Sequence, residues 1–227
     1  MKVIEPGWKI LTPISKDGIE ELQHLERIAR VCYKSEDHIT NDGESAKKLI
    51  RSLINSGHHA MLEHGVISVW FCCDRGISHE LVRHRVASFA QESTRYCNYA
   101  NDKFGNELTF IRPYFFEDSV RYSLWEEQMK HAEEIYLDLI ATGAKPEEAR
   151  SILPNSLKTE IVVTANYREW GHIFALRCSS KAHPQMRELM LPLLDEMNNR
   201  IPMLFEGVKP QCVDPSPVVT STATWRG

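Results

Sequence analysis

Residues 66–73 read Val66-Ile67-Ser68-Val69-Trp70-Phe71-Cys72-Cys73, an apolar run of residue types that favour β-strands. This run predicts a buried strand, and Thr159–Ala165 predicts a second strand much later in the chain. Apolar residues at helical spacing predict further helices, at Ile19–Tyr33, Glu44–Asn55, Asp118–Thr142, Tyr167–Arg177 and Pro184–Asn199. Because strands and helices do not alternate regularly, the sequence predicts an α+β fold rather than a doubly wound parallel sheet.

Shorter elements are expected between these segments. Short strands or extended segments are predicted at Val3–Ile4, Lys9–Ile14, Thr94–Tyr99 and Leu108–Tyr114. Ser78 can cap a helix that runs to about His84, and Pro146-Glu147-Glu148 is a good first turn for another. The apolar residues of the long helix predict its inner face, at Val120, Leu124, Ala132, Ile135, Tyr136, Leu139 and Ile140.

The composition narrows the class of protein. The chain has 227 residues, 42% of them hydrophobic, which is enough to bury the core of a single catalytic domain spanning 1–227. A net charge of −4 disfavours a nucleic-acid binder. The six cysteines form no C-x-x-C pair, which indicates reduced thiols and a cytoplasmic protein. No stretch of about 18 apolar residues predicts a membrane span. The tail from Lys209, rich in Pro, Ser and Thr, is expected to be poorly ordered.

The usual phosphate-binding loops are absent. The sequence contains no G-x-G, so the glycine fingerprint of dinucleotide-binding proteins is missing, and it contains no G-x-x-x-x-G-K-[ST] loop. A dinucleotide would therefore have to be held by side chains and helix ends. Arginine suits that task because its planar guanidinium can bind two phosphate oxygens at once.

The segment 83–96 carries the candidate chemistry, and it reads Arg-His-Arg-Val-Ala-Ser-Phe-Ala-Gln-Glu-Ser-Thr-Arg-Tyr. If residues 78–84 are helical, Arg83 and Arg85 lie about 200° apart and reach two ligands or two sides of a subunit interface. If residues 91–95 are extended, Gln91, Ser93 and Arg95 share one face, which suits a phosphorylated polar ligand.

An alternative interpretation of this segment is a solvated basic turn paired with Glu80 and Glu92. Upstream, His58-His59-Ala60-Met61-Leu62-Glu63-His64 clusters histidine with glutamate and raises the possibility of a zinc site. Its spacing, however, matches neither H-E-x-x-H nor H-x-x-E-H. Structural histidines with no ligand role are the other alternative for this cluster.

The pattern Arg83-His84-Arg85, seven residues, then Ser93 resembles the signature of flavin-dependent thymidylate synthases. Other segments resemble that family in the same order, from about residue 20 to about residue 205: Ala29–Tyr33, His58–His64, Ala149–Pro154, Asn166–Arg177 and His183–Gln185. The chain departs from the family where Cys32 replaces a serine, Glu80 replaces a common glutamine, and Ala90-Gln91-Glu92 differs from the usual Asn-Glu pairing.

The resemblance implies a fold and an activity. The fold would have helices packed around a mainly antiparallel sheet. The activity would be the reductive methylation of deoxyuridine monophosphate (dUMP) to dTMP, with methylenetetrahydrofolate as the carbon donor and NADPH reducing bound FAD. Family members are homotetramers whose flavin sites are built from several subunits. Neither a nucleic-acid partner nor a metal is implied.

The resemblance also implies a role for each matching residue. Ser93 and Arg177 would be catalytic, with Ser93 polarising or positioning the nucleotide. The residues implied at dUMP are Glu80, Arg83, Gln91, Ser93, Arg95, Arg150 and Arg177. The residues implied at FAD are Cys32, His58, Glu63, Arg83, His84, Arg85, Val86, Asn166, Arg168, His172 and His183. On a helix, Arg168 and His172 share a face, whereas Arg177 lies about 180° from Arg168.

Three rival functions predict different observations. A nucleic-acid-binding domain that uses Arg83–Arg85 predicts colourless protein and steeply salt-dependent binding. A zinc hydrolase built on His58–His64 predicts stoichiometric zinc and inhibition by a chelator. A flavin oxidoreductase that consumes NADPH without methylating would be yellow, and only a product assay would separate it from the methylating enzyme.

Overall fold

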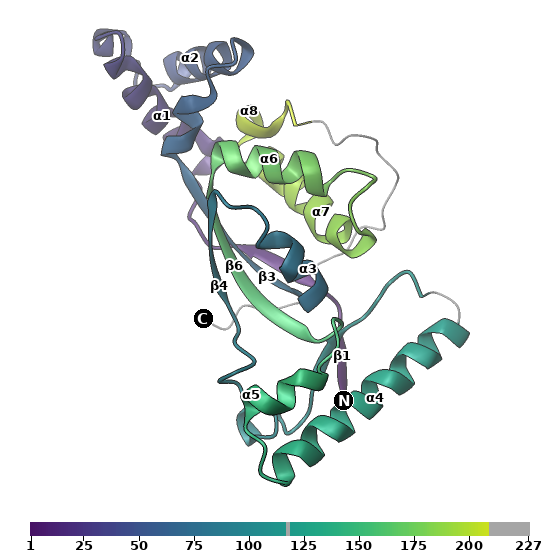
Figure 1. The fold of residues 1–227 in the computed structure, drawn as a ribbon. Helices are drawn as coiled ribbons and strands as arrows, with labels where there is room; N and C mark the ends of the chain where they lie inside the picture. The colour runs from purple at the N-terminus through teal and green to yellow at the C-terminus, as the bar shows by residue number, and fades with distance from the viewer. Residues whose placement is uncertain (117–118, 209–227) are drawn as a thin grey trace.

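A twisted antiparallel sheet forms the centre of the computed structural model, which describes residues 1–116 and 119–208 (Figure 1). Its strands, in spatial order, are β2 (Gly7–Ile10), β3 (Val66–Asp74), β6 (Lys158–Asn166) and β4 (Ala87–Gln91). Every neighbouring pair in this sheet is antiparallel. Two further strands, β1 (Lys2–Ile4) and β5 (Thr109–Ile111), form a separate parallel pair. The α+β prediction with a mainly antiparallel sheet is confirmed.

The burial of the two long strands explains the sequence pattern of each. In β6 buried and half-buried residues alternate, because only one face of that strand packs on the main core. In β3 nearly every residue is buried. Val69 and Phe71 of β3 pack in the main core, whereas Trp70 and Cys72 pack with Ile111 in a small cluster. A strand covered on both faces reads as the continuous apolar run from which we predicted it.

The helices lie in groups around this sheet (Figure 1). They are α1 (Ile19–Val31), α2 (Glu44–Asn55), α3 (Arg75–Leu81), α4 (Ser119–Ala141), α5 (Pro146–Ala149), α6 (Tyr167–Arg177), α7 (Pro184–Arg200) and α8 (Pro202–Phe205). Short 3-10 turns lie at η1 (Lys16–Gly18), η2 (Glu36–His38), η3 (His59–His64), η4 (Asp102–Phe104) and η5 (Arg150–Ile152). The helices α1 and α2 lie at one end of the molecule, and α4 and α5 lie at the other.

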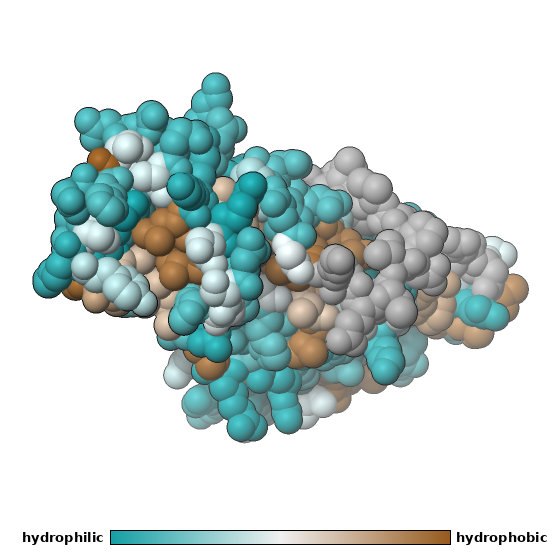
Figure 2. All heavy atoms as spheres, turned by 90° about the horizontal axis from the view of Figure 1, so that it is seen from above, coloured by the Kyte–Doolittle hydropathy of each residue, from teal (hydrophilic) through white to brown (hydrophobic). Residues whose placement is uncertain are grey.

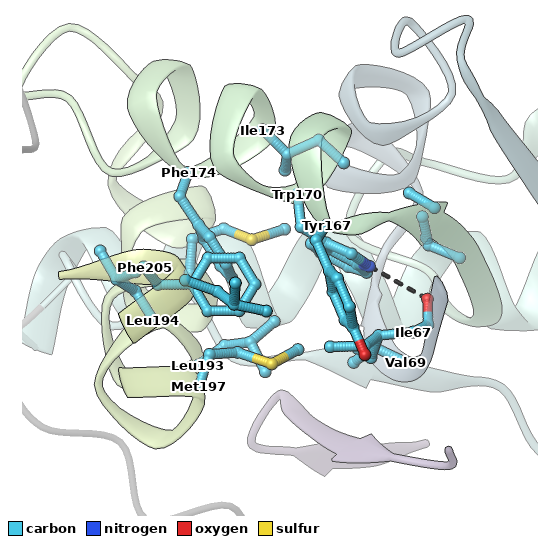
Figure 3. Close-up of a cluster of buried hydrophobic side chains, with 14 of the residues drawn as sticks. Ile67, Val69, Tyr167, Trp170, Ile173, Phe174, Leu193, Leu194, Met197 and Phe205 are labelled. Atoms are coloured by element: carbon cyan, nitrogen blue, oxygen red, sulfur yellow. Dashed lines mark hydrogen bonds between the residues drawn. The ribbon is translucent and has the colours of Figure 1, made fainter. Parts of the chain in front are cut away.

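The main core lies where α6, α7 and α8 pack against β3 (Figure 3). The indole nitrogen of Trp170, a fully buried residue of α6, donates to the carbonyl oxygen of Ile67 on β3 at 3.0 Å. The rings of Phe174 and Phe205 meet edge to face, with their centroids 5.7 Å apart. These contacts hold α6 firmly on the sheet, and α6 carries several of the candidate site residues.

Two expectations about helices were wrong. Helix α3 begins at Arg75 because the Asp74 carboxylate, rather than Ser78, caps it by accepting from the backbone nitrogen of Ile77 at 2.8 Å. It also ends at Leu81, three residues before His84. In α4 the predicted inner-face residues Val120 and Leu124 are 67% and 63% exposed. The predicted inner-face residues Ala132 and Tyr136 are buried, together with Met129, which was not predicted.

The predicted boundaries of α2 and α6 are confirmed, and α1 ends two residues early, at Val31. Of the predicted strand Lys9–Ile14, only Lys9 and Ile10 lie in β2. The tail from Lys209 lies outside the described residues. Within the part of the chain that is described, no helix is both long and apolar enough to cross a membrane.

Candidate active site

The Arg-His-Arg segment lies in the connection between α3 and β4. Because α3 ends at Leu81, Arg83 and Arg85 are not helical, and the helical geometry assumed for them was wrong. The three side chains nevertheless diverge. Arg83 and Arg85 are exposed, whereas His84 is 5% exposed and points into the protein. The histidine therefore has a different task from the two arginines beside it.

His84 joins Arg177 and Glu169, two residues of α6. The Nε–H of Arg177 donates to Nε2 of His84 at 3.0 Å. Because a guanidinium can only donate, Nε2 carries no proton and the proton of the neutral ring lies on Nδ1. Nδ1 is 3.4 Å from the carboxylate of Glu169. The hydrogen bonding of these neighbours thus fixes the tautomer of His84.

The surroundings of His84 also keep it neutral. Burial, then the positive charge of Arg177, and then His172 lower its pKa to about 4. The 3.4 Å contact with Glu169 therefore involves a neutral ring and is not an ion pair. His84 therefore offers no positive charge to a ligand at neutral pH, and its two ring nitrogens face Arg177 and Glu169.

Arg177 is held by Glu80 as well. Its Nη1 donates to the Glu80 carboxylate at 2.8 Å, and its Nη2 donates to the Glu80 carbonyl oxygen at 2.9 Å. Together with the bond to His84, these contacts occupy three of the five N–H groups of the guanidinium, which leaves two at most for a ligand. Glu80, which replaces the glutamine common in the family, thus supplies the counter-charge of Arg177.

The other predicted face of α6 lines a separate cavity. Asn166 caps the helix, its side-chain oxygen accepting from the backbone nitrogen of Glu169 at 2.8 Å. Arg168 is exposed and donates to Glu63 of η3 at 2.5 Å. Together with Val86 and His172, these residues line a cavity of about 350 Å³. The structure therefore brings together five of the predicted flavin residues: Glu63, Val86, Asn166, Arg168 and His172.

A second, more apolar cavity of about 560 Å³ shares Arg168 and His172 with the first. Its apolar walls come from α2, η3, α6 and α8 with the residues that follow: Ile54, Leu62, Tyr167, Ala175, Met203, Leu204 and Val208. Figure 2 views the molecule from the end that carries α1, α2 and α6, and hydrophobic patches are visible there between hydrophilic surfaces. An aromatic ring system beside Arg168 would find apolar surface here.

The predicted nucleotide residues after β4 do not share a face, and that expectation was wrong. Strand β4 ends at Gln91, whose amide nitrogen donates to the hydroxyls of Ser78 at 2.8 Å and Thr159 at 3.2 Å. The chain then turns through residues 94–96 instead of continuing as a strand. Because Gln91 finds its partners inside the fold, only Ser93 and Arg95 remain on the turn.

Arg95 and Arg150 lie in one neighbourhood. Arg95 is exposed and its guanidinium is 3.4 Å from the carboxylate of Glu147 on α5. Arg150 is exposed and begins η5, directly after α5. The turn lies near the Lys158 end of β6, since Lys158 binds Glu92 just before it. Asp74, which caps α3, pairs with Lys158 in the sheet, so the helix that carries Glu80, the partner of Arg177, starts at this same end.

Comparison with known proteins identifies the family. The family model described as "Thymidylate synthase complementing protein" matches residues 19–203. A flavin-dependent thymidylate synthase of Geobacter sulfurreducens is 32% identical over 195 residues, which cover 82% of this chain and 81% of that protein. This chain belongs to the flavin-dependent thymidylate synthase family. The resemblance inferred from the Arg-His-Arg segment is confirmed.

Two further matches concern chain length and fold. A flavin-dependent thymidylate synthase of Pyrococcus furiosus is 36% identical over 156 residues, covering 68% of this chain but 63% of that protein's length. A crystal structure of a UMP/dUMP methylase from Streptomyces cacaoi, bound with 5-Br dUMP, superposes with a TM-score of 0.70. It is 24% identical and covers 91% of this chain and 96% of its own, which shows that the two share a fold.

The arrangement around α6 fits the flavin that the family name implies. Arg168 lines the cavity, Arg85 is adjacent to its lining residue Val86, and both arginines are exposed, so their guanidinium groups are accessible to a phosphate. The contact between Arg168 and Glu63 is partly exposed on both sides, so it is weak and a phosphate can replace the carboxylate.

The remaining flavin residues expected in this family member lie apart from that cavity. Cys32 and His58 are exposed at the ends of α1 and η3. His183 caps α7 through Nδ1, which accepts from the backbone nitrogen of Gln185 at 3.3 Å. It lines a third cavity, of about 390 Å³, that also contains Asp74 and Glu80. Within residues 1–116 and 119–208, none of these three residues lines the cavity that contains Arg168.

One cluster of histidine and glutamate side chains in this family member has the composition of a metal site. Among the described residues, one group could place three ligand atoms within 4.8 Å of one another: His84, Glu169 and His172. Both nitrogens of His84 are engaged, Nε2 by Arg177 and Nδ1 by its own proton facing Glu169. A metal would have to break the Arg177 contact, so we assign none here. His58–His64 contributes no residue to this group.

Sequence reasoning missed Glu169 as a site residue. Its one signal was a position three residues before His172 on the same helix, which places both on one face. The contact that gives Glu169 a role, with His84, joins two segments that are far apart in the sequence and has no local signal.

Proposed function

We propose that this chain converts dUMP to dTMP by reductive methylation, with methylenetetrahydrofolate as the carbon donor, bound FAD as the cofactor and NADPH as its reductant. The observation that carries the proposal is the setting of Arg177. A neutral, buried His84 and Glu80 hold one guanidinium in place next to the flavin-type cavity on the same helix. The whole chain, residues 1–227, would act as one catalytic domain.

Arg177 would act on the pyrimidine. Attack by C5 of uracil requires negative charge to build up on the ring, and a fixed guanidinium stabilises that charge without having to reorganise during the reaction. Glu80 and Arg83, which flank this group at the end of α3, would contact the same nucleotide. Ser93 would polarise or position the nucleotide rather than attack it, since no described side chain acts as a base on its hydroxyl: the Oγ accepts from the backbone nitrogen of Arg95 at 3.3 Å.

Arg95 and Arg150 would bind the phosphate of dUMP through charge-assisted hydrogen bonds. In one chain Arg177 is bound to Glu80 of α3, a helix that starts beside the Lys158 end of β6, where the Ser93–Arg95 turn also lies. We further propose a homotetramer whose sites are shared between subunits, because Cys32, His58 and His183 do not line the cavity that contains Arg168.

FAD, when bound, would supply the hydride that completes the methyl group after NADPH has reduced it. Asn166, Arg168 and His172 would orient it along α6, with Arg83 and Arg85 on its phosphates and Glu63 and Val86 lining its pocket. In an assembly, Cys32, His58 and His183 could reach the flavin of a neighbouring subunit. The free thiols of Cys32, Cys72, Cys73, Cys97 and Cys178 support a cytoplasmic location for this enzyme.

The test has two stages. The absorbance spectrum of the purified protein, with and without added FAD, establishes whether it binds flavin. Tritium release from C5-labelled dUMP, with methylenetetrahydrofolate and NADPH present, then establishes whether it methylates. Flavin binding with NADPH consumption but no tritium release and no dTMP would favour the oxidoreductase that never methylates. A protein that binds no flavin and makes no dTMP would overturn the proposal.

A further inference from the structure

The turn that carries Ser93 and Arg95 is closed at its base by a side-chain contact. Glu92 precedes the turn and Tyr99 follows it, and the Tyr99 hydroxyl donates to a Glu92 carboxylate oxygen at 2.9 Å. Tyr99 is 6% exposed and belongs to the hydrophobic cluster under α4. The two ends of the turn are therefore tied together and to a packed core, which limits the shapes that the turn can adopt.

Lys158, the first residue of β6, anchors the same carboxylate from the other side. Its ammonium donates to Glu92 at 2.9 Å and to Glu160 at 2.6 Å. The backbone nitrogen of Glu160 also donates to Glu92 at 3.2 Å. The other carboxylate oxygen of Glu160 accepts from the Trp70 indole of β3 at 3.0 Å. The base of the turn is thus fastened to the two longest strands of the sheet.

Because Lys158 and Glu92 are largely buried, the loss of either side chain should strongly perturb the other. The side chains of Lys158 and Glu92 are 19% and 13% exposed. Charges that are this far from water interact strongly, and a buried carboxylate that loses its cation is costly. Burial opposes the charge of Lys158, but Glu92 and Glu160 outweigh it and raise the lysine pKa. The ammonium stays charged at neutral pH and holds both carboxylates.

We propose that Lys158 is a positioning residue for the nucleotide phosphate: through Glu92 and Tyr99 it holds the Ser93–Arg95 turn in its phosphate-binding shape. The inference rests on the proposed function, in which this turn binds the phosphate of dUMP. It also gives a role to Glu92, whose segment departs from the family pattern. Lys158 itself touches no substrate in this account and acts only through the turn.

The experiment compares Lys158→Met and Lys158→Arg in the FAD-loaded enzyme. The dissociation constants of dUMP and of deoxyuridine, which lacks the phosphate, are measured together with the FAD content. We expect Lys158→Met to weaken dUMP binding about tenfold, the scale of one lost charge-assisted contact. Deoxyuridine binding and FAD content should not change, and Lys158→Arg should restore most of the dUMP affinity.

A matched control removes another lysine–glutamate ion pair, whose N···O distance is similar to that of Lys158 and Glu92. Lys130 pairs with Glu126 on α4 at 2.8 Å, with the lysine 56% exposed, so Lys130→Met should leave both dissociation constants unchanged. If Lys158→Met weakens dUMP and deoxyuridine equally, or releases FAD, its role is general stability and the inference fails. If neither constant changes, the inference also fails.

Two further variants separate this inference from the proposed function. If Lys158→Met does not fold, Tyr99→Phe removes one bond at the base of the turn, and a loss confined to dUMP again supports positioning while no loss refutes it. Arg95→Ala tests the phosphate site itself. If Arg95→Ala leaves dUMP affinity unchanged, the proposed phosphate site is wrong. If Arg95→Ala weakens dUMP and the Lys158 and Tyr99 variants do not, only the positioning role is wrong.

Discussion

The two groups of candidate nucleotide residues are built in opposite ways. The side chain of Arg177 is 18% exposed, and its guanidinium is held at 2.8–3.0 Å by Glu80 and His84. The side chain of Arg95 is 52% exposed, and its ion pair with Glu147 is 3.4 Å long and also solvent-exposed. One arginine is fixed before any ligand arrives, while the other is free to be drawn toward one.

This difference matches two roles in the proposed function: transition-state stabilisation for Arg177 and phosphate binding for Arg95. A charge that is largely shielded from water and already oriented, like that of Arg177, stabilises a transition state without reorganising. Its loss should therefore affect turnover. An exposed charge in water is screened by salt and exchanges partners easily, so it should affect affinity and its dependence on ionic strength. The fold thus keeps Arg177 rigid on α6 and places Arg95 on a turn.

The largest expected effect comes from Arg177. Arg177→Ala should lower kcat by roughly a hundredfold to a thousandfold, the range for removing one preorganised donor. FAD should remain bound, because Arg168 lies about 180° from Arg177 around α6 and pairs with Glu63 instead. Tritium release under saturating substrates measures the first effect, and flavin absorbance measures the second. Loss of FAD with normal nucleotide affinity would reverse the assignment of the two faces.

The next effect is on stability and comes from His84. Its pKa is about 4 in the folded protein and near 6.5 when unfolded, so the unfolded state binds more protons between those values. Stability should therefore be lost as pH falls from about 6.5 to about 4, by up to about 3 kcal/mol, with no contribution from this residue above that window.

The variant His84→Gln isolates this effect, because glutamine can accept from Arg177 but does not titrate. Urea unfolding at pH 7 and pH 5 measures it. The wild-type protein should lose about 2 kcal/mol more than the variant between these two pH values. Equal losses in the two proteins would mean that His84 is solvated and charged at pH 5, which removes the contrast between the Arg177 group and the exposed turn.

The sequence predicted features that are set within one helix, but not contacts between distant segments. Helical spacing predicted both ends of α6 and the opposite directions of Arg168 and Arg177, because those follow from the geometry of one helix. It did not predict that His84 is neutral, since that depends on Glu169 and Arg177 meeting it across the fold. Local periodicity carries no information on such contacts.

The wrong predictions have the same cause. Thr94–Tyr99 was expected to be extended, and Gln91 to share a face with Ser93 and Arg95, because the sequence alone cannot reveal that Gln91 bonds inward to Ser78 and Thr159. An apolar stripe on α4 was assigned to the core at Val120 and Leu124, where no element of the described chain covers it. Burial is set by the neighbours of a segment, and a single sequence does not place them.

A smaller effect should come from Arg95. Arg95→Ala should raise the KM for dUMP about tenfold, or about 1.4 kcal/mol, and change kcat little. The wild-type KM should rise with added salt more steeply than that of the variant, since the lost contact is the screened one. Arg112 is a matched control: it is 53% exposed and 3.5 Å from Glu5, and Arg112→Ala should change neither value. A fall in kcat with unchanged KM would place Arg95 with Arg177 in catalysis.

The smallest effect should come from Ser93, whose hydroxyl accepts from the backbone nitrogen of Arg95 at 3.3 Å and so helps to shape the turn. Ser93→Ala removes one modest hydrogen bond, so turnover should slow by about threefold to fivefold, on the order of 1 kcal/mol. Ser52→Ala, on the exposed side of α2, is the control. A loss as large as that of Arg177→Ala would mean that Ser93 takes part in the chemistry, and the turn would then be catalytic despite its exposure. Unchanged turnover with normal nucleotide affinity would remove Ser93 from the site and leave Arg95 to act alone.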